Sequence, residues 1–109
     1  MSRPQSLRHV YVFVRSDISK PQQVVQSTHA GIAVARSGLI DPTEPSPLLV
    51  ILRVESQADL FAVADLLSQH GISYRGFVEE DLDDQLTAIA TRPVEAGERK
   101  LFRDFKLVA

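Results

Sequence analysis

Two groups of charged residues along the chain have the types and spacing to carry chemistry. Arg15, Asp17 and Lys20 form a small charged group after a predicted strand, beside the N-terminus of a predicted helix. Because a helix N-terminus favours anions, this group predicts an anion-binding corner, with a surface loop and helix cap as the alternative. The second group places five acids within six residues after a later strand: Glu79, Glu80, Asp81, Asp83 and Asp84. Two such neighbouring carboxylates could supply a general base or a Mg²⁺ ligand, or could form a solvated turn.

The predicted helix after the first group carries a polar stripe. Its members are four, three and four residues apart: Gln22, Gln26, His29 and Ala33. This spacing places them along one side of a helix. His29 is therefore either a polar group aimed at a ligand in a cleft or a helix histidine that donates to a nearby backbone carbonyl.

The residue patterns needed for zinc binding, serine-hydrolase chemistry and P-loop phosphate binding are missing from the sequence. The remaining histidines, His9 and His70, are isolated and the chain has no cysteine, so no zinc site is expected. The chain contains neither a G-x-S-x-G nucleophile elbow nor a glycine-rich phosphate loop, which argues against serine-hydrolase and P-loop chemistry.

The elements that must position these residues follow from hydrophobic periodicity and helix caps. Four short apolar segments predict strands: His9–Val14, Leu48–Val54, Ile72–Val78 and Leu86–Thr91. Three helices are predicted between capping and stop signals: Ser19 to Gly38, Ser56 to Gly71, and Pro93 to about Phe102. The proline-rich segment Asp41–Pro47 is expected to be a loop, and the tail Phe105–Val108 to pack back on the domain.

This β-α-β-α-β-β-α order predicts a single α/β domain over residues 1–109, with a four-stranded mixed sheet covered by helices. The first helix is expected to rest on the sheet through its apolar side: Val25, Thr28 and Ile32, with Val24 and Ala35. In such sheets ligands usually bind at the carboxyl ends of the strands. That edge gathers the Arg15–Lys20 loop and the acidic stretch, so functional residues are expected there.

Composition limits the partners. Twelve Lys and Arg against fourteen Asp and Glu give a net charge of −2, so no global basic field draws the protein onto nucleic acid. The residues outside the acidic stretch carry a net positive charge, which permits a local cationic surface. The chain has no cysteine, no apolar run long enough for a membrane helix and no signal-peptide pattern. It is therefore expected to be cytoplasmic and to have no membrane contact.

Motifs near both ends of the chain resemble those of one known family. Residues 14–17 read V-R-S-D, residues 24–30 read V-V-Q-S-T-H-A, and residues 87–93 read T-A-I-A-T-R-P. Val12–Ala33 resembles the opening of type 2 peptidyl-tRNA hydrolases, where a strand ending in V-R-x-D leads through a lysine-bearing loop into a helix with A-A-Q-x-x-H-A. Residues 87–93 resemble that family's T-x-L/I-x-x-x-P strand, and Leu101–Leu107 resembles the K-F-x-L ending of its shorter, divergent members. The resemblance spans nearly the whole chain in the same element order.

The chain departs from the family pattern in two places. The family's G-K-G-K loop reads S-K-P-Q here, so Lys20 keeps one lysine and Gln22 replaces the second. The D-x-G-R-T segment after the third strand is missing, and Glu79 or Glu80 stands near the place of its aspartate. The divergent members of the family also lack this motif.

The resemblance implies hydrolysis of the ester between a peptide and the 3′ end of tRNA, without a metal or cofactor. On this hypothesis Lys20 neutralises phosphate or oxyanion, Glu80 or Glu79 acts as base or water orienter, and His29 acts near the ester. The polar lining of the same cleft is expected from four further residues: Asp17, Gln22, Gln26 and Thr87. With a single lysine in the loop, tRNA binding is expected to be weak.

Two other functions stay open. The missing G-R-T residues and the acidic balance are compatible with a non-catalytic module that binds tRNA or a protein on the same fold. A small-molecule regulatory domain, built as a sheet-mediated homodimer, would instead bind its ligand at the N-terminus of the first helix and have no tRNA affinity. Release from peptidyl-tRNA and from aminoacyl-tRNA distinguishes these functions.

Overall fold

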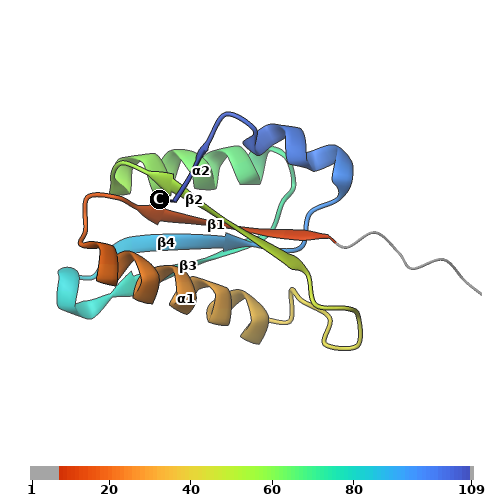
Figure 1. Ribbon diagram of the computed structural model, residues 1–109, viewed down its shortest axis with the longest axis horizontal. Coiled ribbons are helices and arrows are strands. Elements are labelled where there is room, and N and C mark those ends of the chain that lie inside the picture. The colour runs from red at the N-terminus through yellow and green to blue at the C-terminus, as the bar shows by residue number, and fades with distance from the viewer. Residues whose placement is uncertain (1–7, 109) are drawn as a thin grey trace, which may run out of the picture.

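The structure, a computed structural model, describes residues 8–108. Its central feature is a five-stranded mixed sheet in the order β3-β4-β1-β2-β5 (Figure 1). In chain order the strands are β1 (His9–Arg15), β2 (Leu48–Val54), β3 (Tyr74–Glu79), β4 (Gln85–Thr91) and β5 (Lys106–Leu107). Two α-helices and two 3-10 helices connect them: α1 (Lys20–Arg36), α2 (Gln57–Gln69), η1 (Glu80–Leu82) and η2 (Ala96–Phe102).

The strand β1 lies at the centre of the sheet. It pairs in parallel with β2 and antiparallel with β4, and residues 10–14 are buried throughout. A parallel pair needs a long crossover between its strands, and α1 with its following loop supplies it. The prediction of a mixed, partly parallel α/β sheet is confirmed.

The sheet has five strands where the sequence predicts four. The additional strand, β5, pairs antiparallel with β2 through Leu52 with Leu107 and Arg53 with Lys106. It lies within the tail that the apolar pattern predicts only to pack back on the domain. A strand of two residues is too short to show a period-two alternation, so the sequence carries no signal for it.

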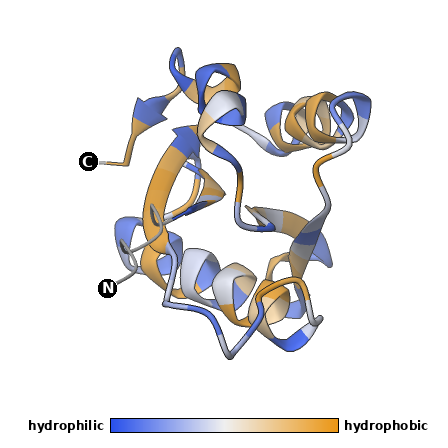
Figure 2. Cartoon of the chain, turned by 90° about the vertical axis from the view of Figure 1, so that its right-hand side faces the viewer, coloured by the Kyte–Doolittle hydropathy of each residue, from blue (hydrophilic) through white to orange (hydrophobic). Residues whose placement is uncertain are grey.

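Helices cover both faces of this sheet. The helix α1 lies on one face over a cluster of small and β-branched residues: Val10, Val12, Val14, Ala30, Val34, Ala88 and Ala90. The helices α2 and η2 lie on the other face, where the buried cluster includes larger side chains such as Phe13, Leu60 and Phe102. The hydrophobic strands are seen between the two helical layers in Figure 2, with α2 and η2 above and α1 below.

The face through which α1 rests on the sheet was predicted wrongly. All five residues expected to face the sheet are exposed. The relative exposure is 66% for Val24, 44% for Val25 and 48% for Ile32, and Thr28 and Ala35 are exposed as well. The buried side of α1 is polar and small instead: Gln26, Ser27, Ala30 and Val34. The strand below presents Ala88 and Ala90, so small helix residues allow a close approach, and hydrogen bonds satisfy the buried polar groups.

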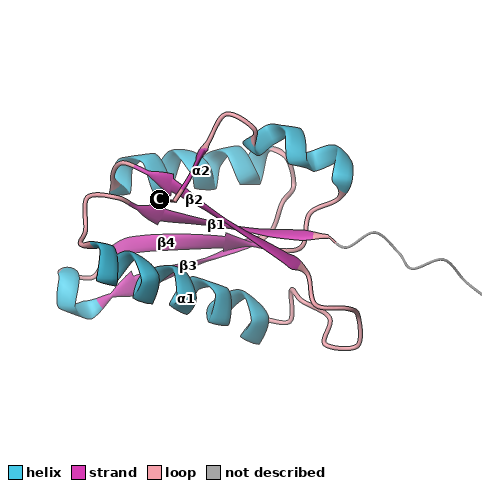
Figure 3. Ribbon diagram, in the orientation of Figure 1, coloured by secondary structure: helices cyan, strands magenta, loops and turns pink. Residues whose placement is uncertain are grey.

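The two α-helices begin and end near their predicted signals. The Ser19 and Ser56 hydroxyls each accept a hydrogen bond from the N–H three residues further on, at 3.3 Å. Gly38 and Gly71 follow the helix ends with φ of +84° and +67°, the left-handed region that glycine adopts without a steric penalty. The proline-rich segment 41–47 is irregular, as expected (Figure 3).

Two predicted boundaries differ from the structure by more than one residue. The third strand begins at Tyr74 rather than Ile72, which is buried just before it. The helix predicted from Pro93 is the 3-10 helix η2, and it begins after Glu95. Within residues 8–108, no helix combines the length and apolar character needed to cross a membrane.

Candidate functional site

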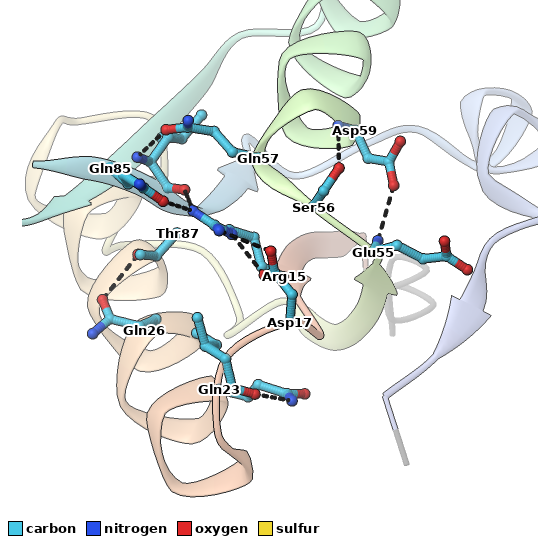
Figure 4. Close-up of polar contacts among 12 residues, drawn as sticks. Arg15, Asp17, Gln23, Gln26, Glu55, Ser56, Gln57, Asp59, Gln85 and Thr87 are labelled. Carbon is cyan, nitrogen blue, oxygen red and sulfur yellow. Dashed lines mark hydrogen bonds and ion pairs between the residues drawn. The ribbon is translucent and has the colours of Figure 1, made fainter. Parts of the chain in front are cut away.

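A buried carboxamide links three elements on the α1 face of the sheet. The side chain of Gln26 is fully buried. Its Nε2 donates to Glu79 Oε2 at 2.9 Å and to Gln22 Oε1 at 3.0 Å. Its Oε1 accepts a hydrogen bond from Thr87 Oγ1 at 2.9 Å (Figure 4). We call these four residues, Gln22, Gln26, Glu79 and Thr87, the Gln26 network.

The orientation of the Gln26 amide follows from its neighbours. A carboxylate only accepts hydrogen bonds, so the NH₂ group must face Glu79. The carbonyl oxygen is then left for the hydroxyl of Thr87, whose Oγ1 also lies 3.2 Å from the carbonyl oxygen of Phe77. The network joins α1, the end of β3 and the start of β4, and each buried polar atom in it has a partner.

The surroundings of Glu79 favour the ionised form of its carboxylate. The hydrogen bond from Gln26, and after it the backbone N–H of Asp81, lower the pKa of Glu79, with a smaller contribution from the charge of His29. A carboxylate with a lowered pKa is a weaker base, but it remains a hydrogen-bond acceptor that can orient water.

His29 lies beside this network on an exposed part of α1. Its ring stacks on Phe77, with centroids 4.3 Å apart and planes 4° from parallel. The stack fixes the imidazole above β3, near the Glu79 carboxylate whose pKa it influences. His29 thus shares the network side of α1, as the stripe of residues predicts.

A second polar cluster surrounds Arg15 at the end of β1. Its guanidinium donates to both carboxylate oxygens of Asp17 at 2.8 Å, to Gln85 Oε1 at 2.7 Å and to the Leu86 carbonyl oxygen at 3.2 Å (Figure 4). These hydrogen bonds with Arg15 are the main cause that lowers the pKa of Asp17. Most donors of Arg15 are therefore used within the protein, and the cluster ties β1 to β4 instead of presenting a free guanidinium to an anion.

Lys20 and Glu80 lie apart from the Gln26 network. Both are exposed, and within the described range 8–108 neither side chain forms a hydrogen bond or ion pair. Six residues separate Lys20 from Gln26, so helix geometry places them about 9 Å apart along the axis and about 120° apart around it. The sequence leaves open whether Glu79 or Glu80 faces the site, and in the structure it is Glu79 that belongs to the Gln26 network.

Sequence reasoning missed three residues that hold this region together. Gln85 binds Arg15, Phe77 stacks on His29, and the side chain of Gln57 accepts the Leu86 N–H at 2.8 Å. None of them belongs to a recognisable motif, so only the three-dimensional structure reveals them. Among residues 8–108, no three His, Asp or Glu side chains are grouped so that they could hold a metal ion.

Together, the fold and the Gln26 network define a small α/β protein with a polar cluster at the carboxyl edge of its sheet. A solved protein of unknown function from Agrobacterium tumefaciens strain C58 has a similar structure, with a TM-score of 0.68 and 15% sequence identity. The match covers 96% of this chain and 100% of that chain. At this identity the likeness shows the fold alone. No family model and no curated protein sequence matches the chain.

Proposed function

We propose that this protein is a peptidyl-tRNA hydrolase-like esterase that acts without a metal. The observation that supports the proposal is the Gln26 network, because it gathers residues from three elements that the family resemblance singled out separately. Gln26, Glu79 and Thr87 meet at one point of the sheet edge. His29 lies beside them.

In the proposed reaction a water molecule attacks the ester carbonyl carbon. Glu79 accepts a hydrogen bond from this water and orients it, while Gln26, itself held by Thr87, donates to the carboxylate and keeps it in place. The tetrahedral oxyanion then collapses and expels the ribose oxygen, which takes up the proton lost by the water. The products are the free peptide acid and tRNA, and Lys20 contributes a positive charge for a nearby phosphate.

The proposed tRNA affinity is weak and depends shallowly on salt. Two arginines that could meet phosphates are engaged within the protein: Arg15 with Asp17, and Arg92 with Glu98 at 2.9 Å. This leaves Lys20 as the loop cation, and each phosphate contact adds about one unit to the slope of log K against log salt. Tight binding that ignores salt would show that the contact is not with the phosphate backbone.

Single-turnover hydrolysis of an N-acetylated aminoacyl-tRNA tests the proposal. We expect the wild-type protein to hydrolyse the ester of the N-acetylated substrate and to hydrolyse unacetylated aminoacyl-tRNA more slowly. Glu79→Gln should lower the rate at least about tenfold, which is a loss of roughly 1.4 kcal/mol of transition-state stabilisation. Asp81→Asn, a matched change at an exposed carboxylate, should leave the rate within about twofold. Release no faster than the uncatalysed rate would refute the esterase.

One observation favours the alternative of a non-catalytic binding module. The Glu79 carboxylate already accepts hydrogen bonds from Gln26 and from the Asp81 N–H, and its lowered pKa makes it a weaker base. If this function holds, the protein binds tRNA in a Lys20-dependent manner and releases no peptide. The same assay, run beside a tRNA-binding titration, therefore distinguishes the two functions.

A further inference from the structure

A cleft of about 540 Å³ opens on the α2 face of the sheet, away from the Gln26 network. Three parts of the chain form it: the end of β2 with Ser16, the first turns of α2, and residues 104–106. The Ser16 N–H donates to the Val54 carbonyl oxygen at 2.8 Å, so β1 and β2 end together beside it. This volume lies in the range that small organic ligands occupy, and carboxyl ends of parallel strands are where such ligands bind.

The inner surface of the cleft is apolar. Val54 and Val63 line it and are only 7% and 3% exposed. Phe105 packs against the same buried cluster, and Ala62 and Leu66 line the α2 side. These side chains suit an apolar ligand body, because burying apolar surface against them stabilises a complex.

Three carboxylates border the cleft: Glu55, Asp59 and Asp104. Asp59 uses its Oδ2 to accept the Glu55 N–H at 2.9 Å. Glu55 and Asp104 form no side-chain hydrogen bond or ion pair within the described part of the chain. The Glu55 carboxylate extends away from the start of α2, on the side where the C-terminal segment lies (Figure 4).

Two cations, Arg53 and Lys106, also border the cleft, but the alternation of β2 and β5 turns their side chains towards the other face of the sheet. Their chain neighbours Val54 and Phe105 pack in the α2-side cluster. Side chains alternate between faces along a strand, and Arg53 and Lys106 are direct partners in the register of β2 and β5. The α2-side opening is therefore bordered by carboxylates.

We propose that this cleft binds a small organic amine, in which a primary ammonium group is attached to an apolar body of about a dozen non-hydrogen atoms. The ammonium donates hydrogen bonds to the Glu55 and Asp104 carboxylates at the rim. The apolar body lies on Val54, Val63 and Phe105. No residue of the Gln26 network takes part, so the site stands independently of the proposed tRNA chemistry.

Three probes that share one indole ring test the proposal: tryptamine, indole-3-propionate and tryptophol. Each is titrated into the isotope-labelled full chain, and the shifts of backbone amide signals are followed by NMR. We expect tryptamine to shift the amides of Glu55, Ala62 and Leu66 saturably, with a dissociation constant at least about fivefold lower than those of the other two probes. Glu55→Gln should weaken tryptamine about two- to fivefold, as expected for one exposed charge pair, and leave tryptophol unchanged.

Two further variants control this experiment. Glu44→Gln removes the same charge from the exposed 41–47 loop and should leave tryptamine affinity unchanged. Ala62→Phe, at an exposed helix position that lines the cleft, should abolish the shifts for all three probes while the protein stays folded. Equal or tighter binding of indole-3-propionate would overturn the proposal, because the cations would then dominate. Absence of saturable tryptamine shifts, or shifts that survive Ala62→Phe, would also overturn it.

Discussion

At the scale of single residues, Arg15 and Asp17 have a structural role. Arg15 is only 8% exposed, and the Asp17 carboxylate neutralises its guanidinium by accepting two parallel hydrogen bonds. A buried guanidinium without this partner would keep only Gln85 and the Leu86 carbonyl as acceptors. Replacing Asp17 should therefore destabilise the protein even though its own side chain is partly exposed.

The pair predicts a pH-dependent stability. Its hydrogen bonds lower the folded pKa of Asp17, so the carboxylate stabilises the fold above its unfolded pKa of about 3.9. This stabilisation is lost as the pH falls through the lower, folded pKa. At pH 7 Asp17→Asn should reduce the free energy of unfolding by about 1 kcal/mol, and the difference from wild type should shrink towards pH 2.

Urea unfolding at pH 7, 4 and 2 measures this difference. Asp65→Asn, a matched change on the exposed side of α2, should alter the unfolding free energy at pH 7 by less than about 0.5 kcal/mol. A difference between wild type and Asp17→Asn that is the same at all three pH values would contradict the role given to Arg15.

The sequence predicts which residues belong to the candidate site, but it does not predict the contacts between them. Gln26, Glu79 and Thr87 were singled out by spacing and by motif. Their contacts join residues 53 and 61 positions apart, and no local pattern reports such distances. The choice between Glu79 and Glu80 also needed the structure, because both follow the predicted strand Ile72–Val78 and only the Glu79 side chain contacts α1, through Gln26.

At the scale of elements, α1 shows how apolar spacing can mislead. Its apolar residues Val24, Val25 and Ile32 have helical spacing, which predicts a buried stripe. Its buried side is instead chosen by fit to the small residues of β4 and by satisfied hydrogen bonds of Gln26 and Ser27. The four longer strands and the caps of the two α-helices were predicted well because their signals are local.

A matched pair of valines tests this assignment. Val34 is fully buried under α1, whereas Val25 is 44% exposed. Val34→Ala should lower the free energy of unfolding by about 1–3 kcal/mol, through lost apolar contact and a residual cavity. Val25→Ala should change it by less than about 0.5 kcal/mol, since alanine also favours the helix. Urea unfolding of both variants gives the answer, and a reversed order of the two effects would restore the predicted face.

At the scale of the whole molecule, a very short strand, β5, covers the outer edge of β2. Only two residues of β5 pair with it, and Val108 adds one backbone hydrogen bond to the Ile51 carbonyl at 3.0 Å. Leu48 and Leu49 lie on the same strand and are 46% and 60% exposed. Unpaired strand edges next to exposed apolar residues favour pairing between molecules.

A chain that ends at Phe105 should therefore self-associate more than the full chain. The truncation removes β5 while keeping the Phe105 ring that packs in the core. Light scattering at several concentrations should show a larger mass that rises with concentration. Leu107→Ser, which keeps the backbone pairing of β5, should behave like wild type. Truncated protein with the same mass as the full chain at every concentration would show that β5 does not protect the edge.

The central position of β1 also has a consequence for synthesis on the ribosome. Among the five described strands β1 emerges first, as an unbroken apolar run over residues 10–14. Its parallel neighbour β2 follows a helix and a loop, and its antiparallel neighbour β4, which includes Ala90 opposite Val12, emerges later still, after α2 and β3. The nascent chain thus exposes a hydrophobic, aggregation-prone strand until its later residues cover it. Slowing translation before β4 therefore prolongs the time during which chaperones are needed.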